Sequence, residues 1–244
     1  MALSPPSKSI APASVVSFLI GLAATLTAFW DGMFGISRWG PVTLAVLLVL
    51  VALAFLRPIA PRGPAALALG GLTGLWLVSV LSTGWADSPG QAKAEAGRWL
   101  LYAAFLAALL PLLRARAQAL GLIAGVAAGC LTVAGYQLIR FLAGTGDGLF
   151  LGDRLDGPIG YANAQADLMA LGLWPLFALA ERGGSRLLRA LGLGGAAALL
   201  SVALLSGTRA VLPILAIVGI ALVALLPGRV RRAWLLLGLA VSVA

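Results

Sequence analysis

The sequence gathers its polar side chains into three short segments, each flanked by long apolar runs. An otherwise apolar chain offers few groups that bind ligands or react, so chemistry is most readily placed where such groups collect. The three segments are 82–102, 144–167 and 205–210. Each of them is therefore a candidate binding site.

In the first segment, the polar run Ser82–Gly90 leads to Glu95, Arg98 and Tyr102. The spacing i, i+3, i+7 places these three side chains on one face of a helix. A helix at the membrane interface, with an ion pair between Glu95 and Arg98, explains the pattern without a ligand.

The second segment, Gly144–Asp167, holds six glycines by position 160. Glycine lets the backbone approach a ligand closely and adopt a positive φ angle. Arg154 lies between Asp153 and Asp156, where a surface ion pair would account for it in structural terms.

The second segment ends where the next apolar run begins, at Asn163 and Asp167. Asn163 is suited to cap the N-terminus of a helix. Asp167 lies one place beyond the position that a reciprocal capping box requires, so the helix dipole explains it only in part.

The third segment joins two apolar runs of 19 residues through Ser206, Thr208 and Arg209. An arginine fork flanked by hydroxyls suits bidentate phosphate binding. If Ala210 opens the next helix, the free N–H groups of that helix add to the same anion site. The alternative is that Arg209 extends to lipid phosphate at the membrane boundary.

The composition points to a membrane protein. Of the 244 residues, 61% are hydrophobic and 10% charged, whereas soluble domains have about 25% charged residues. Disorder is excluded because it requires low hydrophobicity. The absence of histidine excludes imidazole-based zinc sites and triads, and the single cysteine, Cys130, excludes a disulfide within the chain. No metal or cofactor is predicted.

A transmembrane helix needs about 20 mostly apolar residues, and the gaps between charges predict where such helices lie. The chain is predicted to be all-α, a single polytopic helix bundle over 1–244 with eight full spans and a truncated ninth. The predicted spans are 11–30, 39–56, 65–84, 96–113, 117–139, 162–180, 190–208, 210–228 and 233–244.

The positive-inside rule orients these spans. With the N-terminus in the cytoplasm, the cytoplasmic segments hold 11 of the 17 basic residues, from Lys8 and Arg57 to Arg232, and one acidic residue, Glu181. Anionic lipids explain this excess of arginine in short loops, so no nucleic-acid partner is expected. An aromatic belt is predicted at the outer ends of the spans. Its members are Trp30, Trp39, Trp85 and Trp99.

The motifs in all three segments resemble those of bacterial O-antigen ligase-like membrane glycosyltransferases. The stretch Arg154–Ala164 is similar to the outward loop of that family, and Leu205–Ala210 to its Ser/Thr-Arg motif. Upstream, Leu81–Pro89 and Arg98–Tyr102 also follow the family pattern. The three matches occur in the expected order and on the expected side.

This resemblance implies an enzyme of the bacterial plasma membrane. Such an enzyme takes a glycan from a polyprenyl-diphosphate carrier on the outer face and transfers it to an acceptor hydroxyl, without a metal or a nucleotide sugar. Membrane lipids and the carrier-linked glycan are the expected partners. Carried over by motif, Arg154 and Arg209 bind the diphosphate, Arg98 is a further candidate, and Tyr161 and Asn163 line the loop.

One departure from the family is informative. The family has a histidine in a later outward loop that is thought to activate the acceptor, whereas this chain has none and ends inside its ninth apolar run. We therefore expect a fragment that binds carrier lipid without transferring the glycan, unless Asp153 or Asp156 is the base. The resemblance does not distinguish a ligase from a polymerase. Two other functions also remain possible interpretations of the sequence. One is a transporter or flippase, for which Pro175 and Pro213 within the predicted spans are a hint, and the other is a non-catalytic scaffold.

Overall fold

The computed structural model describes residues 12–56 and 61–243. It is 80% helical, with nine α-helices in the described residues, which confirms the predicted all-α class. The described residues form two compact units, one within 33–119 and one within 1–32 and 120–244. Two predicted features, the basic residues Lys8 and Arg57, lie outside the described residues.

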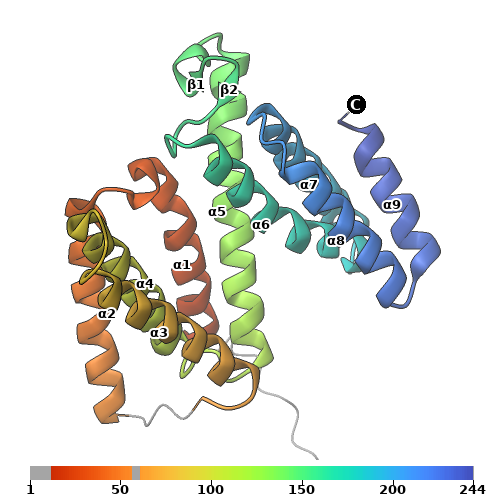
Figure 1. Cartoon of the computed structure of the whole chain (residues 1–244). Coiled ribbons are helices and arrows are strands. Elements are labelled where there is room, and N and C mark those ends of the chain that lie inside the picture. The colour runs from red at the N-terminus through yellow and green to blue at the C-terminus, as the bar shows by residue number, and fades with distance from the viewer. Residues whose placement is uncertain (1–11, 57–60, 244) are drawn as a thin grey trace, which may run out of the picture. The chain divides into compact units, whose positions relative to one another are not determined.

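The unit of residues 33–119 contains three helices, α2 (Ile36–Leu56), α3 (Pro64–Ser82) and α4 (Pro89–Leu109) (Figure 1). Both α2 and α3 pack against α4. A Cβ on Gly97 would come within 2.5 Å of the Trp39 ring, so the absence of a side chain there admits the indole.

The predicted aromatic belt is therefore corrected at one position. Trp39 is only 7% exposed and serves helix packing, whereas Trp30 and Trp85 are 60% and 71% exposed. Trp99 is half-buried.

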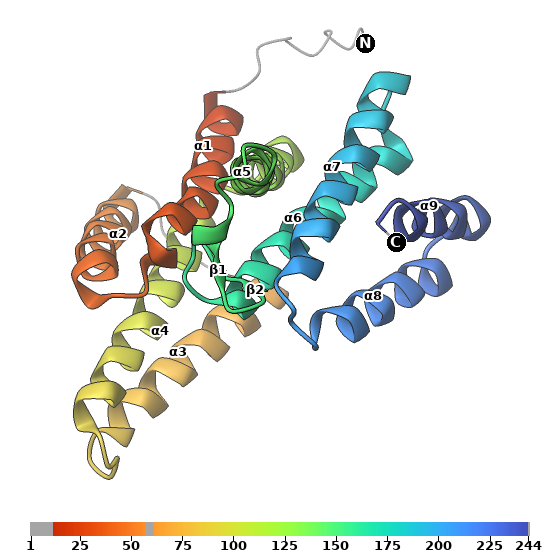
Figure 2. The same ribbon diagram turned by 90° about the horizontal axis from the view of Figure 1, so that it is seen from above.

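In the larger unit, α1 (Pro12–Leu26) continues into a 3₁₀ turn (Thr27–Met33) and lies beside α5 (Arg116–Leu142) in both views (Figures 1 and 2). The two backbones approach closely along Gly121, Gly125 and Gly129 of α5. A Cβ on Gly125 would overlap the carbonyl oxygen of Phe18. This small-residue repeat with a spacing of four is typical of helix pairs in membranes.

The core of the larger unit lies between α5, α6 (Ala162–Arg182) and α7 (Arg186–Leu205). The helices α6 and α7 form a long hairpin (Figure 2). The fully buried side chains of this core include Cys130 from α5, Met169 and Leu173 from α6, and Leu199 from α7. Helices α8 (Val211–Leu225) and α9 (Arg229–Val241) follow and pack against each other.

Five helical segments in the described residues are long and apolar enough to cross a membrane. They are Ala13–Met33, α2, α3, α5 and α7. Many large apolar side chains on their surfaces are exposed, and α3 buries none of its residues, as a lipid environment allows. The chain is thus membrane-associated and multi-pass. The count of eight full spans is a finer statement than these five helices establish.

Each predicted span coincides with one helix, and the ends differ by a few residues. The largest difference is α4, which begins seven residues before the predicted 96 and ends at Leu109. Its first half carries Lys93, Glu95 and Arg98, which a charge-based placement of spans excludes. The predicted limits at 11 and 244 lie outside the described residues.

Candidate functional site

A small β-hairpin positions Arg154. Strands β1 (Phe150–Leu151) and β2 (Arg154–Leu155) pair with Leu151 opposite Arg154, so the loop has two residues. Gly152 opens the loop with a φ of 65°, as a two-residue hairpin turn requires. Leu155 is fully buried and anchors the hairpin, while Arg154 is half-buried.

Arg154 joins the hairpin to two other parts of the unit. Its Nε donates to the backbone oxygen of Ser206 at 3.0 Å. Its Nη2 donates to Oδ1 of Asn163 at 2.9 Å and lies 3.4 Å from Oγ1 of Thr208. One guanidinium therefore links the hairpin, the start of α6 and the joint between α7 and α8.

The neighbours of Arg154 also contact each other. Nδ2 of Asn163 donates to the Tyr161 hydroxyl at 2.8 Å, and the Thr208 hydroxyl lies 3.2 Å from Oδ1 of Asn163. The Ser206 hydroxyl is 2.9 Å from that of Thr208. Five of the predicted site residues thus form one cluster, which we call the Arg154 cluster: Arg154, Tyr161, Asn163, Ser206 and Thr208.

The structural explanation of Asn163 as a helix cap is wrong. The N-cap of α6 is Tyr161, no side chain caps the helix, and Asn163 is its second residue. The Asn163 oxygen faces the guanidinium instead, because a hydrogen bond from a charged donor is stronger than one from a backbone N–H.

The joint after α7 is shaped to receive Arg154. Gly207 has a φ of 61°, a conformation that residues with a side chain rarely adopt. A Cβ there would also lie 3.3 Å from Cγ of Arg154. Glycine at this position lets the backbone turn sharply against the arginine stem.

The charge of Arg154 is not neutralised by the part of the chain that the structure describes. Its partners are neutral oxygens, and it forms no ion pair with Asp153 or Asp156. Asp153 is exposed at the hairpin turn and Asp156 is half-buried. The predicted alternative of a surface ion pair is therefore not observed. Nη1 has no hydrogen-bond partner among the described residues, so its N–H groups are available to an anion.

Two helix N-termini begin beside this cluster. No side chain caps α6 at Tyr161 or α8 at Ala210. Ala210, the predicted first residue of the helix, is the N-cap residue, and α8 begins one place later at Val211. Arg209 follows Thr208 directly, is exposed, and forms no hydrogen bond or ion pair with residues 12–56 or 61–243. Free helix N–H groups and two cations favour an anionic ligand.

Besides Asp153, Asp156 and Arg209, two more predicted site residues do not join the Arg154 cluster. Asp167 is exposed on α6 without a polar partner among the described residues. Arg98 belongs to the other unit, where Nη1 lies 2.5 Å from Oε1 of Glu95 and Nη2 donates to the Phe34 backbone oxygen at 3.1 Å. The predicted internal ion pair of this helix is thus confirmed. The guanidinium also lies 4.6 Å from the centre of the Phe34 ring.

A glutamine pair that the sequence analysis does not single out lies next to the loop that carries Arg154. Gln137 and Gln165 are fully buried, and Nε2 of Gln137 donates to the backbone oxygen of Gly157 at 2.6 Å. Nε2 of Gln165 lies 3.4 Å from Oε1 of Gln137. This pair ties the loop that carries Arg154 to α5 and α6. The available signal was the presence of an amide side chain within each of the predicted spans 117–139 and 162–180.

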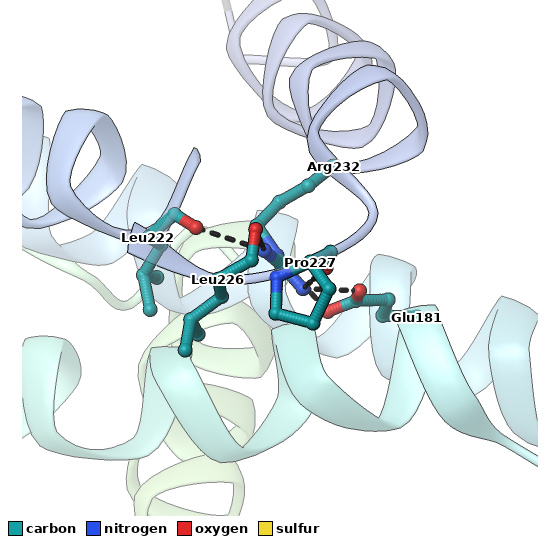
Figure 3. A network of polar contacts seen from close by, with 5 residues as sticks. All are labelled: Glu181, Leu222, Leu226, Pro227 and Arg232. Atoms are coloured by element: carbon teal, nitrogen blue, oxygen red, sulfur yellow. Dashed lines mark hydrogen bonds and ion pairs between the residues drawn. The ribbon is translucent and has the colours of Figure 1, made fainter. Parts of the chain in front are cut away.

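A second omission is an ion pair at the other end of α6 (Figure 3). Nη2 of Arg232 lies 2.5 Å from Oε1 of Glu181, and Arg232 is only 1% exposed. The same guanidinium donates to the backbone oxygens of Leu222, Leu226 and Pro227. Arg232 is thus a buried connector between α6, α8 and α9, which corrects its prediction as a loop residue facing lipid.

No protein-family model, curated protein or solved structure matches the chain. Within the described residues, no group of three His, Cys, Asp or Glu side chains is placed to hold a metal ion. The arrangement around Arg154 is therefore the main indication of what the chain binds.

Proposed function

We propose that the chain binds the diphosphate of a polyprenyl-diphosphate-linked glycan and supplies the donor site of an O-antigen ligase-like membrane glycosyltransferase. The observation that supports this proposal most is that the charge of Arg154 has no counter-charge among the described residues. Arg154 is a half-buried cation held by neutral oxygens, with Nη1 free of partners in the described residues. An anion at Nη1 would provide the missing opposite charge.

Several features favour a diphosphate with a lipid tail over a small anion. Arg209 is adjacent to Thr208 and supplies a second charge for a second phosphate. The N-termini of α6 and α8 contribute backbone donors and a favourable dipole. The surrounding helices expose apolar side chains on which a polyprenyl chain can lie, such as Leu212 and Leu205.

The chemistry follows from the leaving group. The bond between the anomeric carbon of the glycan and the diphosphate oxygen breaks, and its electron pair stays on the diphosphate. The acceptor oxygen bonds to the anomeric carbon, and its proton passes to a base, for which Asp153 and Asp156 remain the predicted candidates. Arg154 and Arg209 stabilise the charge that develops on the diphosphate.

The proposed location is the bacterial plasma membrane, with the N-terminus in the cytoplasm and the Arg154 cluster on the outer face. The basis is the distribution of arginines in the sequence. Every helix from α1 to α8 then crosses the membrane once.

The test measures binding of a long-chain polyprenyl diphosphate to the full chain in lipid nanodiscs, with the monophosphate and the uncharged polyprenol of equal length as comparisons. We expect the diphosphate to bind tightest. Arg154→Gln should raise its Kd at least about tenfold, which corresponds to about 1.4 kcal/mol.

The matched control is Arg186→Gln. It removes the same charge from an exposed arginine at the opposite end of α7 from Ser206. This variant should bind as the wild type does. Equal affinity of the Arg154→Gln variant and the wild type, or an equal loss in both variants, would contradict the proposal.

A further inference from the structure

The turn between α3 and α4 carries a shallow pocket of about 460 Å³ that is open to solvent and shares no residue with the Arg154 cluster. We call it the α3–α4 cavity. Its polar and aromatic lining includes Ser82, Asp87, Ser88, Gln91, Glu95 and Trp99.

Three of these side chains have hydrogen-bonding groups that the described chain does not use. The carboxylate of Asp87, the hydroxyl of Ser88 and the amide of Gln91 are exposed and have no hydrogen-bond or ion-pair partner among the described residues. Ser88 occupies the N-cap position of α4 without its side chain capping the helix. The cavity therefore presents a carboxylate, a hydroxyl and an amide that remain available to a ligand.

Two other side chains of the lining, Glu95 and Trp99, are held in place by their neighbours. The Trp99 ring meets Tyr102 edge to face, with ring centres 5.6 Å apart. Oε1 of Glu95 is bound by Arg98, which Phe34 fixes in turn. A ligand thus meets an aromatic surface and a carboxylate that are already positioned.

The charges and hydrogen-bonding groups of the lining residues indicate which class of ligand fits the cavity. Asp87 and Glu95 disfavour a phosphate, while the Glu95 charge is already balanced by Arg98, which leaves one free carboxylate and makes a cation site poor. A carboxylate, an amide and hydroxyls together can bond the closely spaced hydroxyls of a sugar. The Trp99 ring offers an apolar surface for the C–H groups of the same ring.

We propose that the α3–α4 cavity binds a neutral sugar residue. The sugar hydroxyls are bound by Asp87, Ser88 and Gln91, and one face of the sugar ring packs on Trp99. This site goes beyond the proposed diphosphate site and does not depend on it, because a sugar without phosphate or lipid is sufficient to occupy it.

The experiment uses saturation-transfer NMR on the full chain in a detergent without a sugar headgroup. The probes are galactose, N-acetylglucosamine and maltotriose, each free of lipid and phosphate. We expect saturation transfer to the C–H protons of at least one probe. Gln91→Ala and Trp99→Ala should each raise its Kd at least about fivefold.

The matched control is Trp85→Ala, which removes an exposed tryptophan of the same turn that does not line the cavity. Its affinity should equal that of the wild type. Circular dichroism checks that each variant is folded, and Gln91 is exposed enough to be replaced without loss of packing.

Failure to bind any of the three sugars, or binding unchanged in the Gln91→Ala variant, would overturn the proposal. So would calcium binding that Asp87→Asn abolishes in a chain that binds no sugar. A negative result here leaves the polyprenyl diphosphate assay unaffected, so the two proposals fail separately.

Discussion

Arg154 illustrates how a single residue sets the properties of its surroundings. It is the one arginine whose contacts connect the hairpin, the start of α6 and the end of α7 within the described residues. A partly buried charge without an opposite charge is costly. The described residues supply only neutral oxygens to Arg154, so the anion that we propose would also provide the missing counter-charge.

The substitution Asn163→Asp tests this trade directly. It places a carboxylate where Oδ1 now lies, 2.9 Å from Nη2 of Arg154, and within the first turn of α6, where a negative charge is favourable. We expect thermal stability to rise, by the equivalent of about 1 kcal/mol, and affinity for polyprenyl diphosphate to fall at least about tenfold. Thermal unfolding and nanodisc binding measure the two quantities.

The control for the added charge is Gln118→Glu, another amide-to-acid change in the first turn of a helix, α5. It should leave diphosphate affinity unchanged. If Asn163→Asp lowered stability and affinity together, the loss of binding would reflect a damaged fold and not a neutralised arginine.

At the scale of elements, two close helix contacts are built around glycine. Gly125 of α5 faces Phe18 of α1, and Gly192 of α7 faces Ala180 of α6. Lipid supplies little hydrophobic drive for helices to associate, so close backbone packing has to hold them together. Glycine spacing therefore determines which helices pair.

The substitution Gly125→Val should separate α1 from α5, because its Cβ would overlap the Phe18 carbonyl. We expect a fall in the thermal midpoint, with a cost of about 1–3 kcal/mol from overpacking. Gly135→Val is the comparison, since it lies on the same helix where a Cβ meets nothing within 4 Å. Equal midpoints for the two variants in a thermal scan would show that the α1–α5 contact contributes little.

The pair Glu181 and Arg232 holds three elements together. Removal of one partner from a buried ion pair costs about 3–5 kcal/mol, because the other charge is left uncompensated. Glu181→Ala should therefore destabilise the protein by about this amount, and Arg182→Ala, its exposed neighbour, by much less. Equilibrium unfolding in detergent measures both.

The double variant Glu181→Leu with Arg232→Met refines this expectation. It removes both charges, so it should be more stable than Glu181→Ala. Its recovery should stay incomplete because the backbone oxygens of Leu222, Leu226 and Pro227 lose their donor. A double variant no more stable than the single one would show that the carbonyl contacts, and not the ion pair, supply the stability.

The sequence was sufficient to predict elements whose cause is local. Apolar runs between charges gave a helix for every predicted span, since helix formation and lipid exposure depend on residues near in sequence. All five residues of the Arg154 cluster are among the predicted site residues, because they lie in short polar segments. The prediction also includes Arg98, Arg209 and Asp167, which do not join the cluster. The contacts between the residues of the cluster were not predictable. Arg154 forms a hydrogen bond with Ser206, which is 52 positions away, and neither polar segment indicates that the other lies beside it in the fold.

Charge alone misled where tertiary contacts decided the outcome. The neighbouring Arg229 and Arg231 predict a lipid-facing loop for Arg232. Its burial depends on Glu181, which is 51 positions away. Local capping preferences likewise predict that Asn163 caps a helix, because they do not include a charged donor from the hairpin.

At the scale of the molecule, two polar clusters lie at opposite ends of the same helices. Arg154 brings the start of α6 to the end of α7, and Arg232 brings the end of α6 to the end of α8. The helices α6, α7 and α8 therefore run between the same two levels. If α7 crosses the membrane, as its length of 20 residues and its mean hydropathy allow, then α6 and α8 cross it as well.

Accessibility of introduced cysteines tests this arrangement. In a Cys130→Ala background, Asp147→Cys reports on the α5–α6 loop and Gly184→Cys on the α6–α7 turn, both at exposed positions. In spheroplasts treated with a membrane-impermeant maleimide, we expect the Asp147→Cys variant to be labelled and the Gly184→Cys variant to be protected. Permeabilised spheroplasts should label both, which controls for reactivity.

Each other outcome of this experiment has a distinct meaning. Labelling of the Gly184→Cys variant alone would reverse the orientation inferred from the arginines. The same result at both positions would mean that α6 does not cross the membrane. Such a topology, with α7 crossing as one of the five long apolar segments, would place Arg154 and Ser206 on opposite sides. The hydrogen bond between these two residues requires that they lie on the same side. If α7 crosses the membrane, the contacts of the Arg154 cluster therefore require that positions 147 and 184 are accessible from opposite sides.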